Sequence, residues 1–277
     1  SEHMELMPEK VVVNLEGRDI IVQAWKYKVQ GIKDFFIPVY FLDTDVPENS
    51  EEDRKITDHL YGGDQRYRIR QEAILGIGGF KILEALGYKD IRKYHLNEGH
   101  SAFLTLELLR KYENKRETVK EKCVFTTHTP VPAGHDQFEK DDVKSILRKE
   151  FIDIIEKNNF YYDNKVNMTY LALENSEYIN GVAQKHKEVS RSMFPNYPID
   201  SITNGVHSLT WTCEEFKELF DNHIKGWRHD PFNLRYSLRL SRKEIWDAHL
   251  KAKKRLIEYI NSNSDVEMDL NTFTVGF

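Results

Sequence analysis

Three short polar segments hold residue types that suit a sugar-binding site. Their sequences are LNEGH (96–100), TTHTP (126–130) and TNGVH (203–207). The hydroxyl groups of a sugar both donate and accept hydrogen bonds. An asparagine amide offers both functions, a carboxylate accepts, and a neutral histidine does one of each. Where a glycosidic bond breaks, a nearby backbone carbonyl or carboxylate can stabilise the positive charge at the anomeric carbon.

Each segment also has a purely structural explanation. Asn97 and Glu98 could cap the helix that follows, since Asn is a preferred N-cap residue. His128 could be a loop histidine that hydrogen-bonds to backbone. A zinc site could be drawn from Glu98, His100, His128 and His135, but their spacings match no zinc motif. We therefore predict no metal site, and the structural and sugar-binding explanations of the loops stay open at this point.

Two further motifs have simpler explanations. The glycines of GIGG (76–79) lie inside a helical pattern and not between a strand and a helix, so they predict close helix packing and no dinucleotide site. A group of basic residues predicts a solvated helix face: Lys251, Lys253, Lys254 and Arg255.

The N-terminal part of the chain is predicted to form β structure. Apolar runs at 11–15 and 20–25 flank a turn-like EGRD (16–19), which predicts a hairpin. Residues 35–42 predict a third strand, and Pro38 places it at a sheet edge or a bulge.

Helical patterns then alternate with strands. Apolar spacing predicts a helix over 68–86, with Asp64 as its cap and Gly87 just past its end. Ser241 and Glu244 predict a capping box for a long charged helix at 241–261. Further strands are expected at 91–96, 123–127, 199–202 and 271–277, and further helices at 101–112, 141–156, 166–173 and 183–194. This alternation predicts an α/β fold, a Rossmann-like parallel sheet with flanking helices plus the N-terminal β-hairpin region. Ligands of such sheets bind beyond the carboxyl ends of the strands, where the three polar segments fall.

Composition limits the class of protein. The 277 residues are 40% hydrophobic and 31% charged, as in a globular protein with a real core. The formal net charge is -5, from 40 Lys+Arg against 45 Asp+Glu, which argues against a nucleic-acid partner. We expect no membrane partner either, because no apolar run approaches the roughly 20 residues of a membrane span. Cys123 and Cys213 form no disulfide framework, so we expect a reducing, cytoplasmic location.

Several longer motifs resemble α-glucan (glycogen or maltodextrin) phosphorylases, and the bacterial and archaeal branch more than the animal branch. The resemblance runs in order from about residue 10 to the end of the chain. It rests on YGGD (61–64), RIRQE (68–72), YHLNEGHSAF (94–103), VFTTHTPVPAGH (124–135), VNMT (166–169), NGVAQKHKEVS (180–190) and ITNGVH (202–207).

The resemblance implies a GT-B architecture of two Rossmann-like domains, of which residues 1–210 would form part of the first and 211–277 lead into the second. It implies the cofactor pyridoxal phosphate, and a reaction in which inorganic phosphate releases the terminal unit of an α-1,4-glucan as glucose 1-phosphate. His128 would lie beside the glucosyl ring, its carbonyl facing the developing charge, and Asn204 would hydrogen-bond the same sugar. Glu98 and His100, with Asn97, would line the pocket.

The family motifs that this sequence lacks are as informative as those that it shares. We find no counterpart of the family's glycine-rich phosphate loop, its phosphate-binding basic residues or the lysine that binds the cofactor. Both ends look cut, so we expect an internal fragment that is inactive alone and that self-associates through exposed apolar surface. Two alternatives remain: a non-catalytic glucan-binding or assembly module of the same family, and a sugar-nucleotide-dependent glycosyltransferase of the same architecture.

Overall fold

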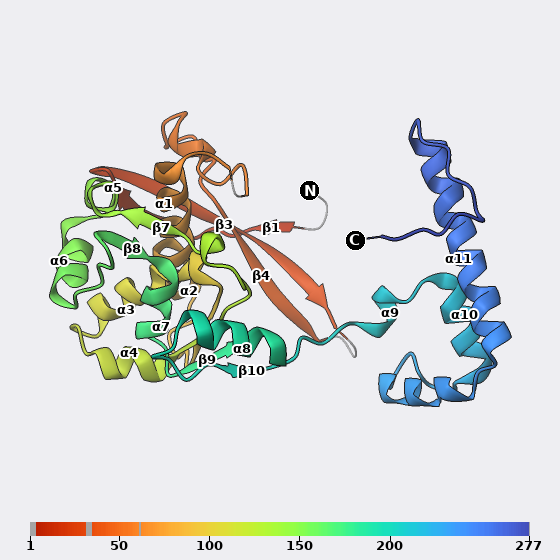
Figure 1. The fold of residues 1–277 in the computed structure, drawn as a ribbon. Coiled ribbons are helices and arrows are strands. Elements are labelled where there is room, and N and C mark those ends of the chain that lie inside the picture. Colours follow the sequence, from red (N-terminus) through yellow and green to blue (C-terminus); the bar gives the residue numbers. More distant parts are fainter. Residues whose placement is uncertain (1–3, 32–34, 61, 277) are drawn as a thin grey trace. The chain divides into compact units, whose positions relative to one another are not determined.

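The computed structural model describes residues 4–31, 35–60 and 62–276, and the chain divides into two units (Figure 1). The first unit spans Ser1–Thr203 and the second spans Asn204–Phe277. The predicted domain boundaries, 1–210 and 211–277, stay predictions.

The first unit opens with an antiparallel sheet built around one long strand. Its strands are β1 (Met4–Leu6), β2 (Val11–Leu15), β3 (Arg18–Gln30) and β4 (Phe36–Asp43), and β3 pairs with each of the other three. Glu16 and Gly17 connect β2 to β3 with φ of 52° and 75°, the pair of positive values typical of a tight two-residue hairpin. Pro38 lies in β4, which among the described strands pairs only with β3, so the predicted hairpin and the edge position of Pro38 are confirmed.

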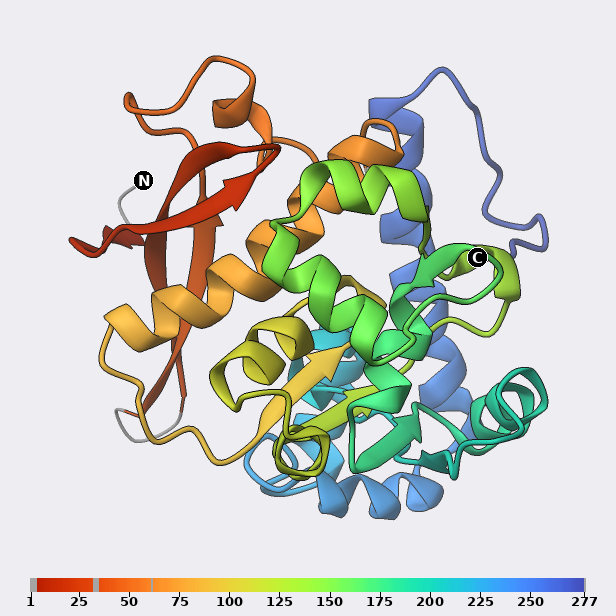
Figure 2. The ribbon, with the colours of Figure 1, turned by 90° about the vertical axis from the view of Figure 1, so that its left-hand side faces the viewer.

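A continuous helical run packs on this sheet (Figure 2). It consists of α1 (Gln65–Ala73), the π-helical η3 (Ile74–Gly78) and α2 (Gly79–Ala85). The Asp64 side chain accepts a hydrogen bond from Tyr67 N, and Gly87 follows the run with φ of 90°, as predicted. A Cβ on Gly76 would lie 2.5 Å from the backbone nitrogen of Leu104, which confirms the close packing expected of GIGG.

A parallel four-stranded sheet follows, and this part confirms the α/β prediction. Its strand order is β5-β6-β9-β10, with every neighbouring pair parallel. The strands are β5 (Tyr94–Asn97), β6 (Cys123–Thr126), β9 (Tyr178–Gly181) and β10 (Asp200–Ser201). A two-stranded antiparallel pair accompanies it, made of β7 (Gln137–Glu139) and β8 (Lys165–Asn167).

Helices flank the parallel sheet. They are α3 (Leu104–Lys111), α4 (Arg116–Lys122), α5 (Lys140–Ile146), α6 (Lys149–Lys157), α7 (Met168–Glu174) and α8 (Gln184–Met193). Short 3₁₀ turns complete the unit: η2 (Asp53–Lys55), η4 (Gly99–Ser101) and η5 (Pro132–Gly134). One hydrophobic core joins the hairpin, the helical run and the parallel sheet, and it includes Val13, Ile77, Phe103, Phe125 and Leu171.

Two helix predictions in this unit are wrong in detail. The helix expected over 141–156 is broken between α5 and α6 because Leu147 forms a β-bridge with Leu15, and Glu16 N donates to Ile146 O. The helix expected over 166–173 starts only at Met168, because Val166 and Asn167 belong to β8; Asn167 then caps α7 by accepting from Tyr170 N. In both places tertiary pairing outweighs local helix propensity.

The second unit contains α9 (Ser208–Trp211), α10 (Glu214–His223), the 3₁₀ helix η6 (Pro231–Arg239) and α11 (Arg242–Asn263). The predicted capping box of α11 is present: Ser241 accepts from Glu244 N, and the Glu244 carboxylate accepts from Ser241 N. The strand expected at 271–277 is not found within 271–276, and Phe277 lies outside the described residues. No described strand pairs with this segment, and a strand needs a pairing partner. None of the helices in the described part of the chain is long and apolar enough to span a membrane.

Candidate functional site

The carboxyl edge of the parallel sheet brings two of the three polar segments together. β5 ends at Asn97 and β6 ends at Thr126, and these two residues are partners in the register of adjacent parallel strands. Glu98 continues from one strand, and Thr127 and His128 continue from the next. Glu98 N donates to Thr126 O at 2.8 Å, so the segments that follow β5 and β6 stay paired one residue beyond the sheet.

The Glu98 carboxylate then clamps the neighbouring loop. Its Oε2 accepts from the backbone N–H of His128 at 2.7 Å and from Thr129 Oγ1 at 2.9 Å, and its Oε1 accepts from Gly99 N at 3.1 Å. Glu98 is 9% exposed, so these bonds are largely shielded from water. The capping prediction is therefore confirmed in part: Glu98 caps the 3₁₀ turn η4, but α3 has no side-chain cap, and the Glu98 side chain also fixes the backbone at His128.

Glu98 reaches this position through an uncommon backbone conformation. Its φ is 67° and its ψ is 172°, an extended region that is populated almost only by glycine and that costs a residue with a Cβ about 1–3 kcal/mol. Non-glycine residues held there gather at functional sites, where the surrounding structure compensates for the strain. Here three charge-assisted hydrogen bonds provide that compensation.

The side chains of Asn97 and His128 are exposed, so both are available to a ligand at this edge. Asn204 is also exposed, but it is the first residue of the second unit. Its predicted convergence with His128 stays a prediction. So do the assigned sugar-binding roles of Asn97, Glu98, His100 and His128.

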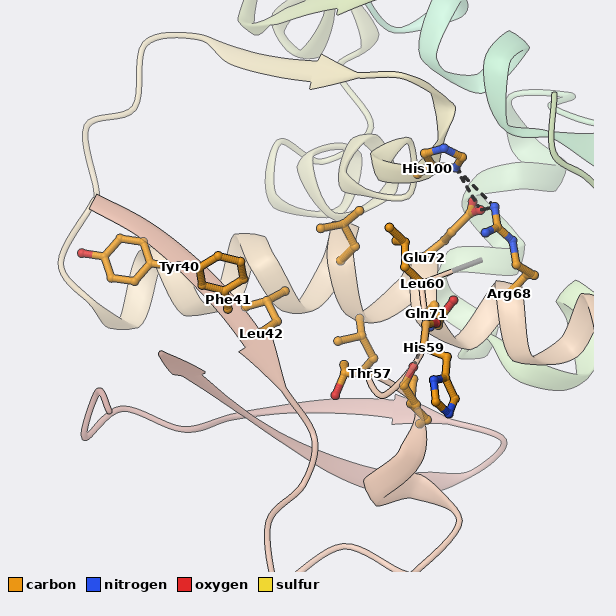
Figure 3. A pocket seen from close by; sticks show the side chains of 13 residues that line it. Tyr40, Phe41, Leu42, Thr57, His59, Leu60, Arg68, Gln71, Glu72 and His100 are labelled. Carbon is orange, nitrogen blue, oxygen red and sulfur yellow. Dashed lines mark hydrogen bonds and ion pairs between the residues drawn. The ribbon is translucent and has the colours of Figure 1, made fainter. Parts of the chain in front are cut away.

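His100 belongs to a cluster of charged side chains beside this edge. It lies in η4, and its Nδ1 is 3.0 Å from Asp136 Oδ2 and 3.5 Å from Glu72 Oε1. Arg68 from α1 pairs with Asp136 and, through Nη2 at 3.1 Å, with Glu72 Oε1. Figure 3 shows the Glu72 carboxyl group turned toward Arg68 and His100.

Burial and charge shift the ionisation of this cluster. Burial raises the pKa of Glu72 to about 8. The hydrogen bond to Asp136, and then that to Glu72, raises the pKa of His100 to about 9. Burial opposes the ionisation of Asp136, but hydrogen bonds from His100 and Glu72 and the charge of Arg68 outweigh it and lower the Asp136 pKa to about 2.

Two cavities meet at this cluster, because Arg68 and His100 line both. One, of about 360 Å³, has mainly apolar walls from β4, the segment before α1, α1 and η3, and its lining includes Phe41, Leu60 and Leu75 (Figure 3). The other, of about 400 Å³, is also lined by Thr129, Gly134 and Asp136. Thr129 is one of the two residues held by Glu98, so the second cavity adjoins the His128 loop.

The donor atoms of Glu72, His100 and Asp136 lie within 4.8 Å of one another, close enough to hold a metal ion. The guanidinium of Arg68, paired with both carboxyl groups, already supplies positive charge there. Of the set considered for a zinc site, only His100 belongs to this group. His135 instead pairs through Nδ1 with Thr169 Oγ1 at 2.8 Å, and burial lowers its pKa.

The predicted site residues omit Arg68, Glu72 and Asp136. One signal was available: Glu72 occupies the apolar face of its helix, among the buried residues Ile69, Ala73 and Gly76. A carboxylate at such a position is rarely buried without a partner. The partner Asp136 could not be found from sequence, because it lies 68 positions from Arg68.

Comparisons with known proteins find relatives named maltodextrin or glycogen phosphorylase. The chain is 36% identical to the maltodextrin phosphorylase of Thermococcus litoralis over 98% of its residues, and 31% identical to the glycogen phosphorylase of Aquifex aeolicus over 94%. It is 35% identical to the glycogen phosphorylase of Mycobacterium tuberculosis over 66%. No protein-family model matches the chain. The matched region is 36%, 42% and 25% of the length of these three relatives, respectively.

Proposed function

We propose that this chain, which belongs to the maltodextrin and glycogen phosphorylase family, supplies the glucan side of a phosphorylase active site. The reaction is the release of the terminal unit of an α-1,4-glucan by inorganic phosphate, giving glucose 1-phosphate. His128 lies beside the glucosyl unit, with Asn204 and Asn97 as hydrogen-bonding partners of the sugar and His100 on the neighbouring wall.

One observation carries this proposal: the Glu98 carboxylate accepts from His128 N at 2.7 Å and from Thr129 Oγ1 at 2.9 Å. Donation of the His128 N–H to this carboxylate fixes the peptide on the amino side of His128, and the bond from the Thr129 hydroxyl restrains the next residue, so the peptide that carries the His128 carbonyl is held from both ends. The His128 carbonyl, aimed at the anomeric carbon, stabilises positive charge only if the loop does not reorganise during the reaction. Glu98 is thus a positioning residue in this proposal, although the sequence assigned it to sugar contact.

The remaining chemistry is not assigned to this chain. Pyridoxal phosphate is the cofactor expected from the family, and its phosphate group would supply acid–base chemistry when bound. The chain's one glycine-rich segment, GIGG, does not fit a phosphate, because Gly76 and Gly78 pack inside a helical run against Leu104 and Val13. We therefore propose that the cofactor, and the second Rossmann-like domain of a GT-B architecture, come from residues outside this chain, which is inactive alone.

The test is calorimetry of the 277-residue chain with a maltooligosaccharide. We expect weak, saturable binding that falls at least fivefold in His128→Ala and Asn204→Ala. His229→Ala and Asn222→Ala, which remove exposed residues of the same types from the second unit, serve as controls that leave affinity unchanged. Absence of binding by the folded parent chain contradicts the proposal, as does equal weakening by the controls.

An activity assay separates phosphorolysis from the alternatives. Phosphate-dependent release of glucose 1-phosphate should be absent for the chain alone and appear when the remainder of a family member is added in trans. Binding without activity in that mixture would favour a non-catalytic glucan-binding module. Competition by a sugar nucleotide against the maltooligosaccharide would favour a nucleotide-dependent transferase.

Self-association of the isolated chain is a second proposal. Large apolar side chains of the second unit are exposed, with Trp211 at 78%, Leu238 at 93% and Phe273 at 89%. Exposed apolar side chains favour association when they gather in patches. Light scattering should show a molecular mass that rises with concentration, and a constant monomer mass at high concentration contradicts this proposal.

A further inference from the structure

In the charged cluster, one of the two oxygens of a buried carboxyl group accepts a hydrogen bond and the other does not. Glu72 is 3% exposed, and its Oε1 accepts from Arg68 Nη2 at 3.1 Å. Its Oε2 is buried with no hydrogen-bond partner in the described part of the chain. An ionised oxygen in that position would lose its hydration without compensation. A protonated one becomes a donor and carries no charge.

An acceptor for that proton is within reach. The donor atoms of Glu72, His100 and Asp136 lie within 4.8 Å of one another, close enough that Asp136 adds to the raised pKa of Glu72 and Glu72 adds to the lowered pKa of Asp136. Two carboxylates this close repel each other, so one proton shared between them is favoured. The charged groups that face Glu72 come from three elements: Arg68 on its own helix, His100 on η4, and Asp136 before β7. His59, before α1, lines the apolar cavity beside them.

We propose that Glu72 is a proton-carrying positioning residue: as a carboxylic acid it donates to Asp136, which in turn holds His100 and Arg68 at the wall of the cavity lined by Thr129. Asp136 then acts as the single carboxylate of the group, bonded to the imidazolium through His100 Nδ1 at 3.0 Å and paired with the guanidinium.

The shared proton sets the charge of that wall. With Glu72 protonated, two cations stand against one carboxylate, so the wall is positive beside the loop that Glu98 holds. Ionisation of Glu72 would cancel that charge and add a competitor for Arg68. A positive wall suits a ligand that presents hydroxyl or phosphate oxygens. This consequence rests on the proposed phosphorylase function, whereas the shared proton does not.

Infrared spectroscopy of the unmodified chain tests the proton directly. We expect a carbonyl band of a protonated carboxylic acid at pH 7 that disappears as the pH rises through about 8. Glu72→Gln should remove this band, and Glu107→Gln should keep it. Glu107 is the matched control because it is equally buried but accepts from Arg110 on both oxygens, at 2.7 and 2.9 Å. A chain with no acid band at pH 7 overturns the proposal even if the variants do not fold.

Titration of His100 by NMR tests the positioning role. Asp136→Asn removes the carboxylate that holds His100, so the pKa of His100 should fall by about one unit or more. Glu72→Gln removes the weaker contribution that Glu72 makes, including the charge that it gains above about pH 8, so it should lower the pKa of His100 by less. A fall in Glu72→Gln as large as that in Asp136→Asn overturns the proposal, because Glu72 would then hold His100 as strongly as Asp136 does. Stoichiometric Zn²⁺ should leave the His100 signals unchanged, and a shift would reassign the group as metal ligands. Loss of maltooligosaccharide binding with these results intact would contradict the proposed function and not the shared proton.

Discussion

Two buried glutamates, Glu98 and Glu72, sit in opposite surroundings within the same unit. Glu98 has three donors for its two oxygens: Gly99 N, His128 N and Thr129 Oγ1. Glu72 has an Oε2 with no partner in the described part of the chain and a second carboxyl group nearby. The first environment uses a carboxylate to fix a backbone, and the second favours a carboxylic acid that shares a proton. The same side chain therefore does different work according to the number of donors that the fold provides.

The largest effect should come from removing the satisfied carboxylate. Glu98→Ala leaves the N–H of His128 and the hydroxyl of Thr129 without their acceptor, and we expect the free energy of unfolding to fall by about 4 kcal/mol. Urea denaturation followed by circular dichroism measures this. Glu98→Gln, which keeps one oxygen acceptor, is the milder comparison. Parent-like stability of Glu98→Ala would show that the clamp contributes little and would break the contrast between the two sites.

The packing beneath the second site can be disturbed without touching its chemistry. A Cβ at Gly76 would lie 2.5 Å from Leu104 N and 2.9 Å from Phe103 C, so Gly76→Ala must push η3 away from the start of α3. We expect a loss of about 3 kcal/mol in unfolding free energy. Gly79→Ala, three residues along the same run, meets only Leu42 Cδ1 at 3.6 Å and should gain up to about 1 kcal/mol from helix propensity. Equal effects in thermal unfolding would contradict the packing described for this run.

The pH dependence of stability tests whether Glu72, unlike Glu98, is a neutral acid. Burial raises the pKa of Glu72 from 4.5 to about 8, so folding takes up a proton between these values and stability falls as the pH rises through that range. The pKa of His100 is raised from 6.5 to about 9, so His100 also makes stability fall as the pH rises. His100 is present in both the parent and the Glu72→Gln variant. Relative to the parent, Glu72→Gln should gain about 3 kcal/mol in unfolding free energy between pH 6 and 9. Denaturant titrations at several pH values measure it; a constant difference contradicts a neutral Glu72.

A partly exposed glutamate, Glu244, should give the smallest effect. Glu244 forms the capping box of α11 with Ser241, where water can replace each bond. Ser241→Ala should cost about 1 kcal/mol of helix stability. Hydrogen exchange at the first turn of α11 reports it, and unchanged protection there would show that the cap makes no net contribution.

Sequence patterns predicted the elements whose signals are local. The hairpin turn at Glu16-Gly17, the Asp64 cap and the Ser241–Glu244 capping box each depend on residues a few positions apart, and all are present. The break at Leu147 was missed because it depends on a bridge to Leu15, far away in the chain. The site divides in the same way. Glu98 and His128 were selected as candidates from their own segments, but the clamp between them and the pairing of Asp136 with Arg68 depend on the register of the folded chain.

In the proposed function, the loop held by Glu98 faces the glucan. The most direct test is a titration of the ¹⁵N-labelled chain with a maltooligosaccharide, followed residue by residue in the amide spectrum. We predict saturable shifts at the amides of His128 and Thr129 that disappear in Glu98→Ala under conditions where that variant is folded. Saturable binding that leaves both amides unmoved would contradict the proposed function.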